Sequence, residues 1–501
     1  IGRSFELEVN AEIWDNTTRL LMKGYLHQRS GIALGPPYTD YMRPLNMHPE
    51  AGLVIHKCDP ALFFNPPVEP STREQKAVFE RIKASILGDT EIPEAWGGWM
   101  DAGDFDQRMT HLWAVRRMAY LHDLEPEYFR AKNYHLPESQ NTIPDILDEG
   151  AWGLDVFRRT QGVYEEGAVS WWVEAVEHPH QGETSWTHSV PTALVPPTPK
   201  ASILYAATAA QLSEAIKNYD SKISADYLRT ALDAMKWADA HQDAPDVFGR
   251  KSTTFYESLA SAHLYRRTGE KAWHLRYQQT LKRLFKNGIA SDISTNNYEV
   301  LVAYLMIEGW DVDPSLREEI EKAIVMLADD LLVGATQNTY SILKPSQGAL
   351  NRMATLGNRV LPVLIAHVIT RDPKYLDALV GTVQYTLGAN PMNRSYISGL
   401  GDRWYEPFHH DWAGNNMPMP AGIPNYGPIT QTETSWGWRG ISSIESIEAT
   451  GLYPSTLASW PHAEKCFNGT WMPPVNEFTV SSPMGELLLL SGYLAAQKAS
   501  D

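Results

Sequence analysis

Three aspartates lie within one short glycine-rich stretch, "GGWMDAGDFD", at residues 97–106. Asp101, Asp104 and Asp106 are so close in sequence that their carboxylates ionise at mutual cost unless water, hydrogen bonds or a metal ion stabilise them. Their spacing does not fit the calcium loop of an EF-hand. Two interpretations remain. Either Asp104 or Asp106 caps a helix that follows, or a carboxylate pair holds a water molecule beside Trp99, whose indole would stack on a sugar ring.

Two adjacent histidines, His409 and His410 in "WYEPFHHDW", are a second candidate for chemistry. Neighbouring side chains rarely converge on one metal ion, and the sequence shows no third ligand beside them. The pair is therefore either a buried structural element or a contact to substrate. The two cysteines, Cys58 and Cys466, lack the spacing of a zinc site, and the sequence leaves open whether they form one disulfide or two buried thiols.

The composition restricts the partners. The chain of 501 residues has a net charge of −17. Such an acidic chain argues against nucleic acid and anionic membranes as partners, and no apolar run is long enough for a membrane span. The 17 tryptophans and 23 tyrosines either pack in the core or line a groove for flat apolar faces such as sugar rings. Among them, Trp171, Trp172 and Trp186 lie in one long loop and are open to both roles.

Helical patterns dominate the chain, and they must position these residues. Asp313-Pro314 predicts an N-cap and a first helical residue. Apolar residues follow it at helical spacing, namely Leu316, Ile320, Ala323, Ile324, Leu327 and Leu331. Polar turns at residues 265–273, 308–316 and 368–376 join one helical pattern to the next. Repeated hairpins, with about a dozen helical segments in all, predict an array of antiparallel helices.

Long irregular stretches interrupt the helices, and a last buried helix is predicted from Met484 to about Lys498. The stretches are rich in Gly, Pro, Trp and His and occupy residues 31–70, 92–106, 164–199 and 399–479. Loops this long inside a helical array indicate a site. Because no linker divides the chain, residues 10–501 are predicted to form one helical domain. Residues 1–9 are predicted to be the last strand of an upstream immunoglobulin-like domain.

Several segments taken together resemble family 9 of the glycoside hydrolases. "GGWMDAGDFD" resembles the family's G-G-[WY]-x-D-A-G-D motif, and "VNEF" at residues 475–478 resembles its N-E motif. "HQRSGIAL" at residues 27–34 is similar to an early helix end in members with an immunoglobulin-like domain. "IPDILDEGAWGLDVFRRTQ" at residues 143–161 resembles the L-D-E-x-x-W-G-L-D helix. "YTLGANPMNRSYISGLG" at residues 385–401 resembles a further family motif that begins L-G-x-N-P.

The resemblance implies an all-α fold, an (α/α)₆ barrel of inner and outer helices, and hydrolysis of β-linked glucans with inversion at the anomeric carbon. Asp104 matches the family's general base, Asp101 the residue that helps to hold the water, and Glu477 the general acid. A general acid must stay protonated near neutral pH, so we expect an apolar wall beside Glu477. Asp106 matches no role, and helix capping is its expected one.

The family also has a P-H-H-R segment, whose first histidine and arginine contact sugar near the cleavage point. His409 matches that histidine and is expected to bind substrate, but Asp411 stands where the arginine usually is. Arg403 is a candidate to replace the arginine. An ionised Asp411 at the sugar would favour short or soluble β-glucans over crystalline cellulose, with small units released from a chain end. Ordinary endo-cleavage is the alternative.

The predicted function is thus cleavage of β-1,4-linked glucan or its oligosaccharides, as in cellulose degradation. One alternative is an exo-acting β-glucosidase or β-glucosaminidase of the same family. A carbohydrate-binding protein without catalysis is disfavoured by the surviving acid–base pair, and a polysaccharide lyase by the acidic net charge. No cofactor is required, and calcium binding stays open. A secreted or periplasmic location is expected, although the chain shows no signal peptide.

Overall fold

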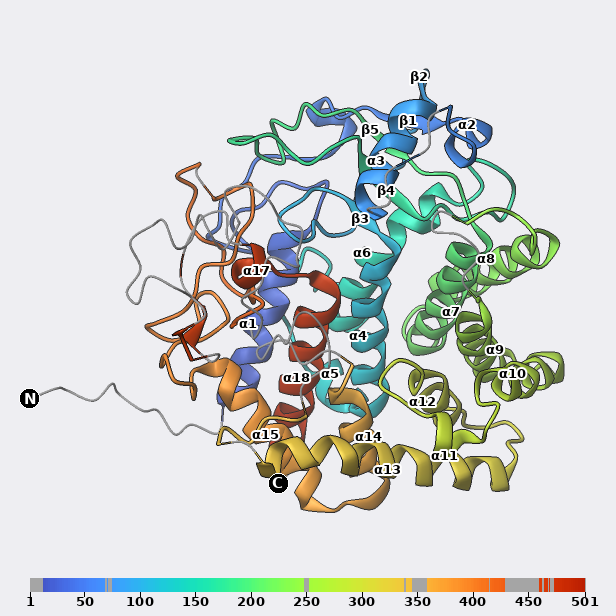
Figure 1. Ribbon diagram of the computed structural model, residues 1–501, viewed down its shortest axis with the longest axis vertical. Coiled ribbons are helices and arrows are strands. Elements are labelled where there is room, and N and C mark those ends of the chain that lie inside the picture. Colours follow the sequence, from blue (N-terminus) through green and yellow to red (C-terminus); the bar gives the residue numbers. More distant parts are fainter. Residues whose placement is uncertain are drawn as a thin grey trace, which may run out of the picture.

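The computed structural model describes residues 12–67, 70, 74–246, 252–337, 339–344, 358–413, 415–428, 459–461, 464–466, 468 and 473–500. Within them, long helices alternate along the chain between an outer and an inner ring (Figure 1). The outer ring contains α1 (Ile13–Gln28), α6 (Asp145–Thr160), α8 (Ser221–Ala240), α10 (Lys271–Leu284), α13 (Pro314–Gln337) and α15 (Pro373–Leu387). The inner ring contains α4 (Leu112–Leu124), α7 (Pro199–Ile216), α9 (Thr254–Thr268), α12 (Glu299–Leu305), α14 (Val360–Thr370) and α18 (Gly485–Ser500).

The inner helices pack side by side into a ring. Helix α4 packs against α7, α7 against α9 and α9 against α12, while α14 packs against α18, which returns to α4. Each outer helix covers an inner neighbour, as α6 covers α4 and α1 covers α18. Every residue of the inner helix α12 is buried. This arrangement is the (α/α)₆ barrel that the family resemblance implied.

The predicted turns between helices carry the capping chemistry that the sequence indicated. Asp313 accepts hydrogen bonds from the backbone N–H groups of Ser315 and Leu316 and so caps α13. Asp372 caps α15 in the same way. Gly269 ends α9 with a φ of +69°, a left-handed conformation that glycine adopts without steric cost. Local sequence therefore sets the ends of these helices.

Buried ion pairs hold three inner helices together. Arg117 of α4 donates to Glu486 of α18 at 2.7 Å. Its neighbour Arg116 donates to Glu299 of α12 at 2.7 Å. Because these side chains are buried, removing one partner would leave an uncompensated charge inside the barrel. The pairs therefore fix α4, which starts just after the aspartate motif, against the rest of the ring.

A small mixed sheet lies beside one end of the barrel, at the top of Figure 1. Its strands are β1 (Ile55–Cys58), β2 (Ile86–Glu91), β3 (Gln107–Arg108), β4 (Trp172–Ala175) and β5 (Thr192–Leu194), in the order β2-β1-β5-β4-β3. Strands β1 and β5 run parallel, and the other pairs are antiparallel. Strands β1, β4 and β5 lie in stretches that were predicted to be irregular, and that prediction was wrong there, because strands this short show too little alternation to be recognised.

Shorter helices complete the described chain. They are η1 (Pro49–Ala51), α2 (Pro60–Phe64), α3 (Glu74–Ser85), η2 (Met109–His111), α5 (Pro126–Arg130), α11 (Ile289–Asp292) and α17 (Pro473–Asn476). A π-helical turn, η6 (Val480–Met484), leads into α18, so the predicted last helix has an irregular start. Cys58 and Cys466 are both buried free thiols. In the described ranges, no helix has the length and apolar character that a membrane span needs. The strand predicted within residues 1–9 lies outside the described residues.

Candidate active site

Asp101 and Asp104 stand at the two ends of one tight turn. The Asp104 N–H donates to the Asp101 carbonyl oxygen at 2.7 Å. Between them, Ala102 and Gly103 have φ of +52° and +86°, as in a type I′ turn. A left-handed conformation costs an alanine about 1–2 kcal/mol, so the surroundings hold Ala102 in place. Glycine is required at 103, because a Cβ there would lie 2.7 Å from Cε1 of Phe408.

The carboxylate of Asp101 joins this turn to the C-terminal part of the chain. Its Oδ1 accepts a hydrogen bond from the Val480 N–H at 2.7 Å, and its Oδ2 lies 3.2 Å from Nε2 of His111. The Val480 carbonyl in turn accepts from the Tyr25 hydroxyl at 2.7 Å. Buried and bonded in this way, Asp101 positions the turn, and its predicted contact to the water stays a prediction.

Glu477 is partly buried just after α17. The carbonyl of the preceding residue, Asn476, accepts from the Phe408 N–H at 2.8 Å, and the Glu477 carbonyl accepts a further backbone N–H at 2.8 Å. Val480, which binds Asp101, is only three residues further along the chain. The structure therefore brings the segment of the predicted acid to the turn that carries the predicted base.

Phe478, the residue that follows Glu477 in sequence, belongs to an aromatic stack. The rings of His409 and Trp412 lie 4.4 Å apart at 16°, and the buried ring of Phe478 stacks beside them. An apolar wall against the Glu477 side chain itself stays a prediction. Nδ1 of His409 accepts from the Asp411 N–H at 3.0 Å, which places the proton of a neutral ring on Nε2. Burial lowers the pKa of His409 well below its ordinary value, so the ring is neutral.

Asp104 itself is mostly buried and meets a histidine that the sequence analysis did not single out. Its Oδ1 lies 3.2 Å from Nδ1 of His178. Burial raises the pKa of Asp104, but the hydrogen bond from His178 and the charges of Arg108 and His410 outweigh it and hold that pKa below its ordinary value. A base that is ionised before substrate arrives is what general-base catalysis requires.

Asp106 does not cap a helix, which corrects the prediction. The helix that follows has Arg108 at its N-cap position and no side-chain cap. Asp106 instead forms a buried ion pair with Arg108, which also donates to Glu174 at 2.9 Å. Burial raises the pKa of Asp106 to about 6, although the charge of Arg108 opposes this shift. Asp106 and Glu174 line the same small cavity as Asp104.

Trp99 does not offer a ring face to a sugar, which is a second correction. The side chain is fully buried, and its Nε1 donates to Oε1 of Glu149 on α6 at 2.7 Å. Glu149 also binds the buried Arg29 at 2.9 Å. These residues come from three of the motifs that carried the family resemblance. Trp99 is therefore a positioning residue, which anchors the start of the Asp101 turn to the barrel.

Asp411 does not face a sugar either. Its carboxylate is buried, and its oxygens accept from the N–H and the hydroxyl of Ser185 at 2.6 and 2.8 Å. Asn46 donates to the same hydroxyl at 2.9 Å. The three residues come from three separate loops, so these bonds clasp the loops together. The substrate preference that was predicted from an exposed Asp411 loses its basis. Arg403 is exposed, and its contact to substrate stays a prediction.

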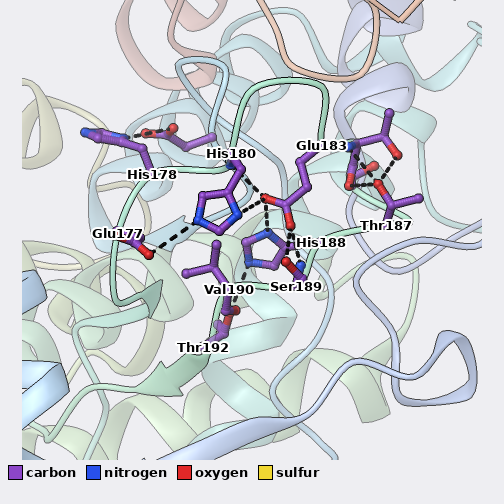
Figure 2. A network of polar contacts seen from close by, with 12 residues as sticks. Glu177, His178, His180, Glu183, Thr187, His188, Ser189, Val190 and Thr192 are labelled. Atoms are coloured by element: carbon purple, nitrogen blue, oxygen red, sulfur yellow. Dashed lines mark hydrogen bonds and ion pairs between the residues drawn. The ribbon is translucent and has the colours of Figure 1, made fainter.

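The loop of residues 177–192, named here the histidine loop, carries His178. Figure 2 shows Glu183 at its centre, between His180 and Ser189. The Glu183 carboxylate accepts from the His180 N–H at 2.7 Å and from the Ser189 N–H at 2.6 Å. Charge-assisted bonds to two backbone groups fold the loop onto itself. The loop follows β4, whose partner β3 lies just after the aspartate turn.

His178, Arg108 and Glu174 were missed in the sequence. The available signal was the density of His and Glu at residues 174–188, in a loop already noted for its length. In that same loop, the candidate stacking residues Trp171 and Trp172 are buried. In the part of the chain that the structure describes, no group of three or more His, Cys, Asp or Glu residues is arranged to hold a metal ion. Calcium binding therefore stays an open prediction.

Three comparisons relate this fold and site to known proteins. The model of Glycosyl hydrolase family 9 matches residues 16–437. The chain is similar to a cellulose 1,4-β-cellobiosidase of Acetivibrio thermocellus, with 23% identity over 86% of this chain and 52% of the relative. It is 22% identical to the xyloglucan-specific endo-β-1,4-glucanase BoGH9A of Bacteroides ovatus, over 81% of this chain and 70% of the relative.

Among solved structures, a metagenome-derived family 9 endoglucanase has a TM-score of 0.76 with 22% identity, over 99% of this chain and 83% of that one. A likeness at this level of identity shows that the fold is shared. The chain spans about half the length of the first of the two sequence relatives.

Proposed function

The chain belongs to glycosyl hydrolase family 9, and from this premise we propose that it is an inverting hydrolase that cleaves β-1,4-linked glucan or its oligosaccharides. The relatives it resembles are named for cellulose and for xyloglucan, both of which have β-1,4-linked backbones. None of the three reported relatives is named a glucosidase or glucosaminidase, so that alternative is not favoured.

In the proposed reaction, Asp104 is the general base. It removes a proton from a water molecule as the water attacks the anomeric carbon, while Glu477 donates a proton to the leaving glycosidic oxygen. The water attacks from the face opposite the leaving group, so a β-linkage yields an α-product. The neutral ring of His409 can donate only through Nε2–H, but the side chain is fully buried within the aromatic stack, so its predicted contact to sugar stays a prediction.

The observation that carries this proposal is the hydrogen bond from the Val480 N–H to Oδ1 of Asp101 at 2.7 Å. It joins the turn that presents Asp104 to the segment that presents Glu477. Rate enhancement by an acid and a base depends on holding both groups in fixed positions around the scissile bond.

Location and cofactor requirements are parts of the same proposal. Polymeric glucans occur outside cells, so we assign the protein a secreted or periplasmic location. Acid–base hydrolysis by two carboxyl groups needs no cofactor.

The test is a substrate panel of soluble mixed-linkage β-glucan, carboxymethyl cellulose, xyloglucan and cellotetraose. We expect new reducing ends from at least one of them, formed about 10²–10⁴-fold more slowly by the Glu477→Gln variant. A folded protein that is inactive on the whole panel would contradict the proposal. Viscosity measured against reducing ends separates the cleavage modes, because an early steep fall in viscosity indicates internal cutting.

A further inference from the structure

The side chain of His178 contacts one oxygen of the proposed base. Nδ1 of His178 lies 3.2 Å from Oδ1 of Asp104, at the edge of the cavity that both residues line. No described residue donates a hydrogen bond to Oδ2 of Asp104, which leaves this oxygen for the attacking water. A carboxylate with one oxygen hydrogen-bonded to the protein and the other oxygen open has the geometry to orient a water molecule.

The position of His178 is built into the fold. Its ring meets Phe79 of α3 edge to face, with centroids 5.1 Å apart at 89°. Its neighbour Glu177 lies 3.6 Å from Lys83 on the same helix. On the other side, the pairing of Arg108 with Trp172 sets how far the histidine loop lies from the aspartate turn. Although His178 is half-exposed, two elements therefore direct it toward Asp104.

We propose that His178 is a positioning residue for the general base, which holds Oδ1 of Asp104 so that Oδ2 faces the water and which keeps the carboxylate ionised in acidic solution. This inference rests on the proposed role of Asp104. It extends that role to a residue outside the acid–base pair and to the pH range in which the enzyme works.

The charges around the pair agree with this role. Arg108 on β3, Glu174 on β4 and His410 face the pair. Asp106, Glu177 and His188 line the same cavity. Burial lowers the pKa of His178, but Asp104 and Glu174 outweigh it and raise that pKa to about 9. The two members of the pair therefore carry opposite charges from acidic to mildly alkaline pH.

The test compares the pH dependence of kcat/KM for His178→Ala, His178→Asn and the wild type. The acid limb of this profile reports the pKa of the base in the free enzyme. In His178→Ala we expect the acid limb to move up by about one pH unit or more, and kcat to fall about 10- to 100-fold. In His178→Asn the amide still donates but is uncharged, so kcat should largely recover while the acid limb stays shifted.

His180→Ala is the matched control, because His180 is a similarly exposed histidine of the same loop and its ring contacts Glu177 and Glu183 but not Asp104. The inference would be overturned if the acid limb of the kcat/KM profile did not shift in either His178 variant. It would also be overturned if His180→Ala shifted the acid limb by the same amount. If His178→Ala fails to fold, the pKa of His178 is measured in the wild type and in Asp104→Asn instead, from the pH dependence of the C2–H proton resonance of His178. Loss of the carboxylate charge must lower the pKa of His178, and an unchanged pKa would refute the pairing. Full activity in Asp104→Asn would instead refute the proposed function itself.

Discussion

Gly153 of α6 lies against the indole of Trp99 with no space between them, since a Cβ at residue 153 would lie 2.1 Å from Cη2 of Trp99. The glycine lets the helix approach the ring, and the ring anchors the turn that presents Asp104. A residue without a side chain thus determines where the proposed base sits, from a helix that does not contact it.

The first prediction concerns Gly153→Ala. The added methyl group must displace Trp99, and overpacking of this kind costs about 1–3 kcal/mol in the free energy of unfolding. The turn moves with the ring, so kcat should fall as well. Urea denaturation and kinetics on a soluble glucan measure both effects. Gly88→Ala is the control, because a Cβ there meets no atom within 4 Å. An unchanged kcat in Gly153→Ala would show that Trp99 does not position the turn that carries Asp104.

The second prediction concerns the acid–base pair. Asp104→Asn and Glu477→Gln should each lower kcat by about 10²–10⁴-fold while the fold is kept, since general acid–base groups contribute this much. Asp106→Asn should lower kcat much less, because Arg108 still donates a hydrogen bond to Glu174. Initial rates together with circular dichroism spectra test this. Equal losses in all three variants would show that the cavity charge matters more than the individual groups.

The third prediction is stereochemical. Because water and not a carboxylate attacks the anomeric carbon, the first product from a β-linkage should be the α-anomer. Proton NMR spectra taken in the first minutes of hydrolysis of a cello-oligosaccharide distinguish the anomers before they equilibrate. Accumulation of the β-anomer first, or a trapped glycosyl-enzyme, would rule out this mechanism.

The fourth prediction concerns the clasp between Ser185 and Asp411. Ser185→Ala removes one donor from a buried carboxylate, which should cost about 1–3 kcal/mol of stability. Since the clasp joins loops around the site, KM should also rise. Thermal denaturation and kinetics measure the two effects, with the exposed Ser252→Ala as control. A stability loss with unchanged KM would mean that the clasp supports the fold alone.

The fifth prediction is a pH dependence of stability from Asp148. Burial raises its pKa to about 7, while the hydrogen bond from Asn141 partly opposes the shift. The folded state therefore keeps a proton that the unfolded state releases above its lower pKa, so the wild type loses stability between about pH 4 and 7. Asp148→Asn should remove this loss. The urea midpoints of the two proteins should agree at pH 4 and differ at pH 8 in favour of the variant. Parallel curves would contradict the assignment.

Helix ends were predictable because they depend on neighbours in sequence. The Asp313 cap bonds residues two and three positions away, so it was visible in the sequence. The roles of Trp99 and Asp411 were not visible, because exposure decides whether an indole stacks on sugar or packs in a core. Their partners, Glu149 and Ser185, lie 50 and 226 positions away in the sequence.

The placement of His178 depends on strand register. The histidine loop reaches Asp104 because Arg108 pairs with Trp172, in strands too short for any periodicity to reveal. Motifs in the sequence predicted Asp104 as the base and Glu477 as the acid, and these two roles stay predictions. The sequence did not predict the side chain that orients the base, since no motif covers the histidine loop.

Closure of the barrel has a consequence for synthesis of the protein. The hydroxyl of Tyr25 binds the carbonyl of Val480 across 455 positions of sequence, and α1 packs against α18. Contacts so distant in sequence form late in folding. A ribosome therefore releases the aspartate turn long before Val480, whose N–H binds Asp101, has been synthesised. A nascent chain that ends before Val480 would carry the whole motif around Asp104 without the hydrogen bond that ties this motif to the C-terminal segment.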